Sequence, residues 1–600
     1  SHCAMRLPHL LAVPALLALA ACNAPYRREV ESYLRDYAQT YQRLSYASQQ
    51  AEWASNTHIV AGDSSNAVRT KAANEALARF VGSVANIDRI RGYLGKAARL
   101  TPLQVRQLEK MLYLAANSPM TVADVVRQRI AAEAEQTERL YGFEFSLRGR
   151  PLTPNQIDEL LRTSTNLAAR RAVWEASKAV GPAVKPGLVR LRDLRNQVVR
   201  ALGYPDFFAY QVSDYGMSTP EMLALCDTLV VQLRPLYRAL HTWARYALAR
   251  RYRQPVPDLI PAHWLPNRYA QDWSALVAVE GLNADSAIRT HTPEWVVRQG
   301  EAFYRSLGFD SLPPTFWQRS SLYPVAADAG LKKNTHASAW HMDLARDVRS
   351  LMSVEANRDW YATVHHELGH VYYFMAYSSP AVPLVLRDGA NRAYHEGVGS
   401  LIELATAQRG YLAGRGLVAR DARVDQIQSL LQEALNYVVF IPFSAGTMTR
   451  FEKMLYADTL APDRFNQAWW DLVRRYQGVE PPAPRDETFA DAVTKTHIND
   501  DPAQYYDYAL SHALLFQLQD HIARTILQQD PHDTDYFGST ATGAFLRNLM
   551  APGSSRPWRV VLRETTGRSL DAQAMVAYFQ PLYTWLQQQN RGRRATLPDL

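Results

Sequence analysis

The chain has 600 residues, of which 47% are hydrophobic, 10% aromatic and 21% charged. These fractions are ordinary for a globular protein and exclude an intrinsically disordered, collagen-like or coiled-coil chain. The net charge is only +8, and no run of five or six basic residues occurs, so a nucleic-acid-binding function has little support.

The N-terminal segment has the features of an export signal. We expect Met5 to be the natural start and residues 1–4 to be additional to the natural chain, and an apolar run extends from Leu10 to Ala21. Such a run is too short to span a bilayer, which needs about 20 residues, but it suits a signal peptide. Its end, Leu19-Ala20-Ala21-Cys22, resembles a bacterial lipoprotein cleavage site.

On that resemblance, residues 1–21 comprise the additional residues and a lipoprotein-type signal peptide, and the mature chain begins at a lipidated Cys22. The alternative is an ordinary signal peptide cut near the same place. We expect residues 22–30 to act as a tether and residues 31–600 to form a single domain. The protein is then exported and lipid-anchored, in a bacterial periplasm or cell envelope.

Helix starts with a common chemistry recur along the chain. Each places a threonine N-cap hydroxyl before a proline at the first helical position. The four pairs are Thr101-Pro102, Thr153-Pro154, Thr219-Pro220 and Thr292-Pro293. Gln104 and Gln156 stand three residues after their threonines, as a capping box requires.

After Thr219, apolar residues recur every three or four positions, including Cys226, as on one face of a helix. Cys226 is therefore predicted to be a core residue, and Pro235 is expected to kink or break this helix. Strand-like alternation is scarce, and residues 320–341 are the best place for a short strand pair. These patterns predict one mostly α domain with two lobes.

A metal-binding pattern lies in Val364–His370, which contains His-Glu-x-x-His. Residues four apart share a helix face, so His366 and His370 can reach one metal ion. Glu367 is rotated by about 100° from His366 and is free to accept a proton from water. His365 is off this face and is predicted to be a packing or supporting residue.

A catalytic zinc needs a third protein ligand and leaves its fourth position to water. The candidates are in the segment that follows, and they are His395, Glu396 and Glu403. Spacing alone leaves all three open, because each lies on the next predicted helix.

Both motif segments, Val364–His370 and Gly389–Gly399, resemble the zinc motifs of the angiotensin-converting enzyme family of zinc peptidyl-dipeptidases. The similarity begins near Ala51-Glu52-Trp53 and continues, in the family's order, through most of the chain. Further matching segments are His336–Trp340, Trp469-Trp470-Asp471 and Lys495–Ile498. The resemblance implies a large helical ellipsoid with a deep central channel between two lobes and few short strands. It also implies N-terminal helices that partly cover the entrance.

The resemblance also implies roles for the motif residues. The zinc ligands are His366, His370 and Glu396, with Glu367 as general base. Tyr508, paired with Tyr505, stabilises the oxyanion, although the neighbouring Tyr506 makes this register ambiguous. Hydrogen bonds to the substrate backbone come from His497 and from the segment with His336 and Ala337.

A pocket for the C-terminal carboxylate of the substrate is implied by Gln271, Lys495 and Tyr505. Phe443 keeps an aromatic residue of this pocket, whereas His512 replaces another, so the pocket is expected to be more polar.

The chain departs from the family at positions where vertebrate members bind chloride through arginines. Asp507 and Val473 stand at two of them, and the third lies near Lys178. Activity is therefore expected to be independent of chloride, with Asp507 paired to a nearby base. Ser400 replaces an acidic residue one turn after Glu396, which weakens zinc binding unless another residue compensates.

The sequence thus predicts a monomeric enzyme with one zinc ion that removes C-terminal dipeptides from oligopeptides with a free carboxylate. Residues 31–600 would be its catalytic domain. A zinc endopeptidase or aminopeptidase is disfavoured by the carboxylate pocket and by the lack of a Gly-x-Met-Glu-Asn type signature. A catalytically weak peptide-binding lipoprotein is the other alternative.

Overall fold

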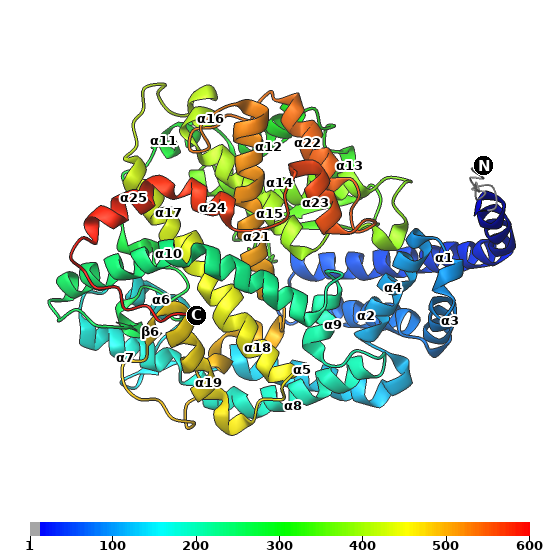
Figure 1. Cartoon of the computed structure of the whole chain (residues 1–600), viewed down its shortest axis with the longest axis horizontal. Helices are drawn as coiled ribbons and strands as arrows, with labels where there is room; N and C mark the ends of the chain where they lie inside the picture. The colour runs from blue at the N-terminus through cyan, green and yellow to red at the C-terminus, as the bar shows by residue number, and fades with distance from the viewer. Residues whose placement is uncertain (1–11) are drawn as a thin grey trace, which may run out of the picture.

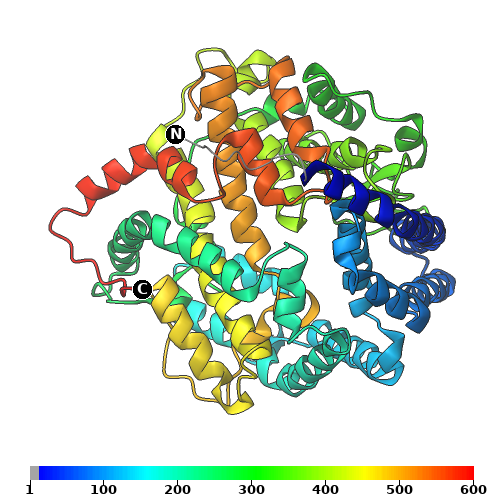
Figure 2. The same ribbon diagram turned by 45° about the vertical axis from the view of Figure 1, so that its right-hand side comes forward.

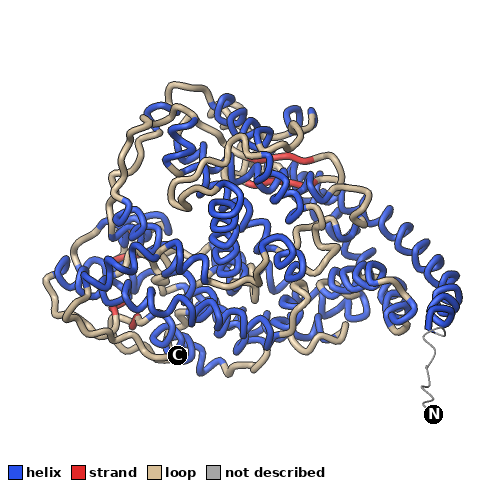
Figure 3. The backbone as a smooth tube through the Cα atoms, turned by 45° about the horizontal axis from the view of Figure 1, so that its top comes forward, coloured by secondary structure: helices blue, strands red, loops and turns tan. Residues whose placement is uncertain are grey.

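Helices form nearly all the regular structure in the computed structural model, which describes the backbone of residues 12–600 and the side chains from residue 23 onward. Within this part of the chain, the strands pair only as three two-stranded ribbons, visible as the red segments of Figure 3. The prediction of a mostly α fold with few short strands is confirmed.

The first half of the chain runs from the right edge of Figure 1 through its lower half. The helices at the edge are α1 (Ala12–Thr57), α2 (Ser65–Val81), α3 (Val84–Leu94) and α4 (Pro102–Ala116). Those that follow are α5 (Ala123–Tyr141), α6 (Pro154–Thr163), α7 (Leu167–Ser177), α8 (Val180–Arg200), α9 (Phe207–Ser213) and α10 (Thr219–Tyr252).

The chain then builds the upper half of the molecule and crosses back to complete the lower half. The helices of the upper half are α11 (Asp285–Ile288), α12 (Pro293–Ser306), α13 (Pro314–Arg319), α14 (Arg358–Tyr377), α15 (Arg392–Ala407) and α16 (Arg409–Gly414). The next helices are α17 (Gln426–Ile441), α18 (Thr449–Tyr456), α19 (Phe465–Leu472) and α20 (Thr496–Asp500).

The C-terminal helices return from the centre to the upper half. They are α21 (Tyr506–His521), α22 (Thr540–Met550), α23 (Trp558–Thr566), α24 (Gln573–Tyr578) and α25 (Gln580–Gln589). Helix α14 packs against α22, and α8 packs against α18, while Figures 1 and 2 both show α22 and α23 in the upper half of the molecule. Each half is therefore assembled from segments far apart in the sequence, which agrees with the predicted two lobes.

Short helical turns connect these elements. The 3₁₀ turns are η1 (Ala97–Arg99), η2 (Met120–Val122), η3 (Ala262–Trp264), η4 (Ser274–Leu276), η5 (Leu384–Leu386), η7 (Pro462–Arg464) and η9 (Ala492–Thr494). Three π-helical segments, η6 (Pro442–Met448), η8 (Val473–Gln477) and η10 (Ile522–Leu527), continue α17, α19 and α21 respectively.

The strand prediction was half right. β4 (Ser338–His341) lies in the expected range, but its antiparallel partner β5 (Val348–Leu351) lies beyond it. The Asp343 carboxylate accepts hydrogen bonds from the backbone N–H groups of Ala345 and Asp347, which closes the connection after β4. The other pairs are antiparallel β1 (Ser146–Leu147) with β2 (Arg150–Pro151), and parallel β3 (Ile260–Pro261) with β6 (Val479–Glu480).

Three of the four predicted helix starts are confirmed. Thr101 and Thr153 form complete capping boxes with Gln104 and Gln156, and the Thr292 hydroxyl accepts from a backbone N–H of its own first turn. The fourth was wrong by one residue. Ser218 caps α10 and Thr219 is already helical, because Ser218 is extended and has Glu221 as its capping-box partner.

Of the two outcomes predicted for Pro235, the break was wrong, since α10 continues from Thr219 to Tyr252, and the kink stays a prediction. A proline removes one backbone hydrogen bond. Here the predicted apolar face is buried on both sides of it, with Cys226, Leu229 and Leu240 all inaccessible to solvent. The face packs on α17, α21 and α25, and this burial holds the turns together. Cys226 is a core residue, as predicted.

The predicted tether, residues 22–30, lies within the long helix α1, where Val30 is buried against the first core residues of this helix. The side chain of Cys22 and the predicted signal peptide up to Ala21 lie outside the residues whose side chains are described. Among the described residues, no helix is long and apolar enough to cross a membrane.

The centre of the upper half is built on glycine contacts around α15, which packs between α14 and α21. A Cβ atom added to Gly369 on α14 would lie 3.1 Å from the Cα of Gly399 on α15. A Cβ on Gly399 would lie 3.0 Å from the Nε2 atom of His366, and one on Gly397 would lie 2.9 Å from the Leu514 side chain on α21. The three helices can approach this closely only because these positions have no side chain.

We predict that Gly399→Ala disturbs the predicted metal site more than the fold. The new methyl group would press on the ring of His366, so zinc affinity should fall by ~10–100-fold, the range seen when groups around a metal ligand are changed. Competition with a chromophoric chelator measures this. Gly92→Ala is the matched control, because its Cβ on α3 would meet nothing within 4 Å. Unchanged zinc affinity in Gly399→Ala would contradict the argument.

Candidate metal centre

Asparagine caps fix the starts of both helices that carry the metal motifs. The Asn357 side chain accepts a hydrogen bond from the backbone N–H of Trp360 at 2.9 Å, at the start of α14. Asn391 accepts in the same way from Tyr394 at 3.1 Å, at the start of α15. These caps satisfy backbone donors that each first turn would otherwise leave unpaired.

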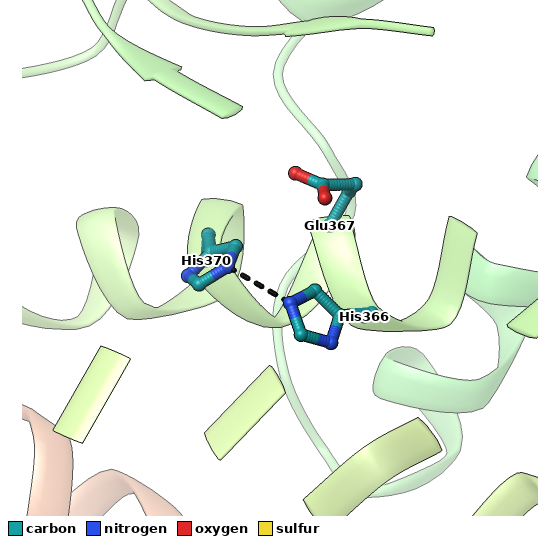
Figure 4. Close-up of side chains that lie close together, drawn as sticks. All are labelled: His366, Glu367 and His370. Carbon is teal, nitrogen blue, oxygen red and sulfur yellow. Dashed lines mark hydrogen bonds between the residues drawn. The ribbon is translucent and has the colours of Figure 1, made fainter. Parts of the chain in front are cut away.

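The two motif histidines face each other, as Figure 4 shows, with their Nε2 atoms 3.2 Å apart. The Glu396 carboxylate lies 3.6 Å from Nε2 of His366 and 3.9 Å from Nε2 of His370. Ligand atoms bound to one tetrahedral zinc at 2.0–2.1 Å lie about 3.3 Å apart. The donor set of two imidazoles and one carboxylate therefore fits zinc in both chemistry and spacing.

The three candidates for the third zinc ligand, His395, Glu396 and Glu403, contact different atoms of the two motif histidines. Only Glu396 approaches Nε2 of both histidines. Glu403 instead lies 3.1 Å from Nδ1 of His366, and His395 places its Nδ1 3.2 Å from Nδ1 of His370. Glu403 and His395 thus contact the outer sides of the two rings.

Burial and charge shift the pKa values of this cluster in the metal-free protein. Burial alone would lower the pKa of His366, but hydrogen bonds to Glu396 and Glu403 raise it to about 10. Burial alone would raise the pKa of Glu396, but the His366 hydrogen bond and the two histidines lower it to about 2. The Glu396 carboxylate is therefore charged at neutral pH and favours a cation between the rings.

Glu367 differs from Glu396 because it is buried, with 8% of its surface exposed. Burial raises the pKa of Glu367 to about 7, and Glu396 and Glu403 add to the effect against the opposing influence of His366. Its ligand atom lies within 4.8 Å of those of His366 and His370. A carboxyl group with a pKa near 7 beside a metal site suits proton transfer at neutral pH.

His365 has the packing role that its position predicts. It is buried, its Nδ1 atom lies 2.7 Å from the backbone oxygen of Tyr361, and its Nε2 atom lies 3.3 Å from the Tyr411 hydroxyl.

The predicted carboxylate pocket is assembled around one buried lysine. The ammonium group of Lys495 donates to the side-chain oxygen of Gln271 at 2.8 Å. It also lies 5.2 Å from the ring centre of Tyr505 and 5.5 Å from that of Phe443. Burial lowers the pKa of Lys495 to about 7, and Arg268 adds to this. Residues from four separate segments therefore meet at one cationic group.

The paired tyrosines Tyr505 and Tyr508 lie beside this pocket, next to His497. The Tyr508 hydroxyl lies 3.4 Å from Nε2 of His497, and the Tyr505 ring contacts both residues. Tyr506 instead faces the core and packs against Phe208 and Tyr215. Tyr505 and Tyr508 are thus on the pocket side, and Tyr506 is not.

One predicted pocket residue, His512, lies further out. His512 contacts Phe440 and Tyr437, and Phe440 in turn contacts Tyr505 and Tyr508. His512 is therefore a layer behind the tyrosines, and burial lowers its pKa to about 4, so that the ring is neutral.

His336 and Ala337 lie just before β4, which packs against α14. The exposed His336 side chain makes no hydrogen bond within the described part of the chain. The structure therefore places this segment beside the motif helix without joining His336 to the other site residues.

Asp507 is paired with a base, as expected. It accepts a hydrogen bond from the Tyr215 hydroxyl, and its other oxygen lies 3.6 Å from Nε of Arg392. Arg392 also makes a bidentate contact with Asp501 at 2.6 and 2.9 Å. The sequence analysis missed Arg392, although it lies one turn before Glu396. Val473 is buried, and the buried Lys178 donates to the backbone oxygen of Arg268.

The metal cluster is reached by solvent although its helices are central. The side chains of His366, His370 and Glu396 are 18%, 12% and 42% exposed. A separate cavity of about 970 Å³ lies near the C-terminal end of α15 and the start of α17, beside Glu433, and the motif histidines do not line it.

Comparison with known proteins agrees with this geometry. The family model described as angiotensin-converting enzyme, peptidase family M2, matches residues 25–597. The chain is 35% identical to the angiotensin-converting enzymes of Rattus norvegicus and Mesocricetus auratus over 73% of its own length and 34% of theirs. It is 29% identical to the angiotensin-converting enzyme-like protein Ace3 of Mus musculus, over 95% of this chain and 78% of that protein.

The chain thus spans about a third of the length of the two converting enzymes that it matches. The family model, by contrast, extends over nearly the whole chain, and its range contains the residues of both predicted metal motifs and of the predicted carboxylate pocket. This chain belongs to the angiotensin-converting enzyme family.

Proposed function

We propose that this protein is a zinc metallopeptidase that removes C-terminal dipeptides from oligopeptides with a free carboxylate. The observation that carries the proposal is the convergence of the donor set of His366, His370 and Glu396 at 3.2–3.9 Å. The Lys495–Gln271 pair supports the exopeptidase specificity, because a fixed cationic group can hold a terminal carboxylate.

His366, His370 and Glu396 are the residues that would hold the zinc ion. When bound, zinc acts as a Lewis acid that lowers the pKa of water to about 7 and polarises the scissile carbonyl.

Glu367 supplies the proton transfers of the proposed reaction. Its carboxylate takes a proton from the attacking water and then delivers it to the leaving amine. Tyr508 donates a hydrogen bond to the oxygen on which negative charge develops. His497, whose Nε2 atom lies 3.4 Å from the Tyr508 hydroxyl, orients this group and the substrate backbone.

Specificity for dipeptides follows from a fixed carboxylate site. Lys495, Gln271 and Tyr505 would hold the terminal carboxylate, and Phe443 would pack on the last side chain. The neutral His512 makes the layer behind Tyr505 and Tyr508 more polar than an aromatic residue would. His336 and Ala337 would reach the substrate backbone from the strand side.

The remaining proposals rest on the sequence. Cys22 is proposed to carry a lipid anchor, because it follows a lipoprotein-type signal, and the chain would then be tethered in a bacterial cell envelope. Oligopeptides are its proposed partners, and a monomer is its proposed state.

We predict that Glu367→Gln lowers kcat by ~10²–10⁴-fold, the usual contribution of a general base, while zinc remains bound. Metal analysis and hydrolysis of a decapeptide, followed by mass spectrometry, measure both quantities. The exposed Glu355 lies just before α14, and Glu355→Gln serves as the control. Sequential loss of C-terminal dipeptides by the unmodified protein supports the proposed function. Internal cuts would favour an endopeptidase. If the zinc-loaded protein cleaves no peptide, a binding role would be favoured instead.

We predict that KM for free-acid peptides rises as the pH increases above 7. Burial lowers the pKa of Lys495 to about 7, so its positive charge is present below this pH and is lost above it. C-terminally amidated peptides should be poor substrates at every pH, and their KM should not rise above pH 7.

We predict that Lys495→Met increases KM for free-acid peptides by ~10–100-fold, the factor that corresponds to the free energy of a charge-assisted hydrogen bond. Lys453→Met, which removes a lysine paired with Asp458 at the surface, is the control. Equal cleavage of both peptide forms would exclude the carboxylate pocket.

We predict that activity is independent of chloride. The Asp507 side chain already lies between the Tyr215 hydroxyl and Arg392, so it occupies the place that an anion would need. Replacing acetate by chloride at fixed ionic strength should leave kcat/KM within about twofold. A steep rise in turnover with chloride would show that an anion site exists in spite of Asp507.

A further inference from the structure

The helix α15 carries two acidic residues on one face, Glu396 and Glu403, which are seven positions or about two turns apart. Both reach the same imidazole from opposite sides. Glu396 approaches Nε2 of His366 at 3.6 Å, and Glu403 approaches Nδ1 of His366 at 3.1 Å. The two carboxylates therefore have different relations to the ion that this ring would bind.

The contact of Glu403 is that of a supporting residue rather than a ligand. Nε2 of His366 faces Nε2 of His370, whereas Nδ1 faces Glu403. The Glu403 carboxylate is not within 4.0 Å of His370, while Glu396 reaches both histidines. When Nε2 gives its lone pair to a cation, the ring proton is on Nδ1, and this N–H donates to Glu403.

The Nδ1 atom of the second motif histidine, His370, faces another imidazole instead of a carboxylate. Nδ1 of His370 faces Nδ1 of His395, whose Nε2 atom lies 3.5 Å from the Tyr377 hydroxyl. Among the described residues, a carboxylate therefore faces the Nδ1 atom of only one of the two rings, and this carboxylate belongs to Glu403. Ser400, on the same helix, makes no side-chain hydrogen bond within the described part of the chain.

We propose that Glu403 is a positioning residue of the metal site, which holds the ring of His366 and its Nδ1–H tautomer and thereby raises the affinity for zinc. The inference rests on the proposed function, because it requires that the cluster binds zinc. It assigns to this chain an acidic support two turns after the ligand Glu396, in the absence of an acid at position 400.

Zinc affinity of the full chain tests this, measured by competition with a chromophoric chelator after removal of bound metal. We expect Glu403→Ala to weaken zinc binding by ~10–100-fold. Glu403→Gln should have a smaller effect, because its side-chain oxygen still accepts a hydrogen bond but has no charge. Ser400→Ala is the matched control and should change the affinity by less than about twofold.

Two further measurements separate positioning from other roles. The unfolding temperature of the zinc-free protein should be nearly the same for all variants, which excludes a general loss of fold. The visible spectrum of the Co²⁺-loaded protein should change in Glu403→Ala and not in Ser400→Ala, because the spectrum reports the orientation and number of ligands.

The outcomes are distinguishable from failure of the proposed function. If the unmodified protein binds no zinc, the proposed function fails together with this inference. If it binds zinc and Glu403→Ala binds it equally well, only the positioning role is wrong. Loss of binding by more than about 1,000-fold in both Glu403 variants, well beyond the range for a supporting residue, would make Glu403 a direct ligand and overturn the proposal.

Discussion

The close approach of α14 and α15 is the constraint on which the site depends. A metal ion accepts ligands only at short and fixed distances, so the two helices must meet almost backbone to backbone. Gly369 and Gly399 make this possible, because any Cβ at these positions would lie about 3 Å from atoms of the other helix. The contact brings Glu396 within reach of both histidines, and Gly397 brings α21, with Tyr508, against the opposite side of α15.

Two carboxyl groups of the site differ in their surroundings, Glu367 on α14 and Glu396 on α15. Glu396 is partly exposed and faces two imidazoles, which keep its pKa near 2, whereas burial raises the pKa of Glu367 to about 7. Two carboxyl groups with pKa values this far apart can divide the tasks of ligand and base. Burial acts in the opposite sense on Lys495, whose pKa it lowers to about 7. Burial therefore brings the pKa of both the proposed base, Glu367, and the lysine of the predicted pocket, Lys495, to about 7.

Charge pairs also link the elements that surround the site. Arg392, at the start of α15, contacts Asp507, at the start of α21. Arg392 also binds Asp501, which lies in the chain just before α21. It thereby connects the helix of Glu396 to the helix of Tyr508. The pair is half-buried, with Asp507 inaccessible and Arg392 40% exposed, so its attraction is less screened than that of a surface pair.

The amino-acid sequence alone determined the helical class, most helix starts and the pairing of His366 with His370, because these depend on residues a few positions apart. It also pointed to Glu396 and to the carboxylate pocket through a family resemblance. Local pattern could not decide that Ser218 caps α10 or that α10 continues through Pro235, since neighbouring residues and core packing override a single signal. Nor could it separate His395, Glu396 and Glu403, or find Arg392. Only the tertiary structure decided these, because the face that a residue presents to another helix depends on how the two helices pack, and here glycines on both set that packing.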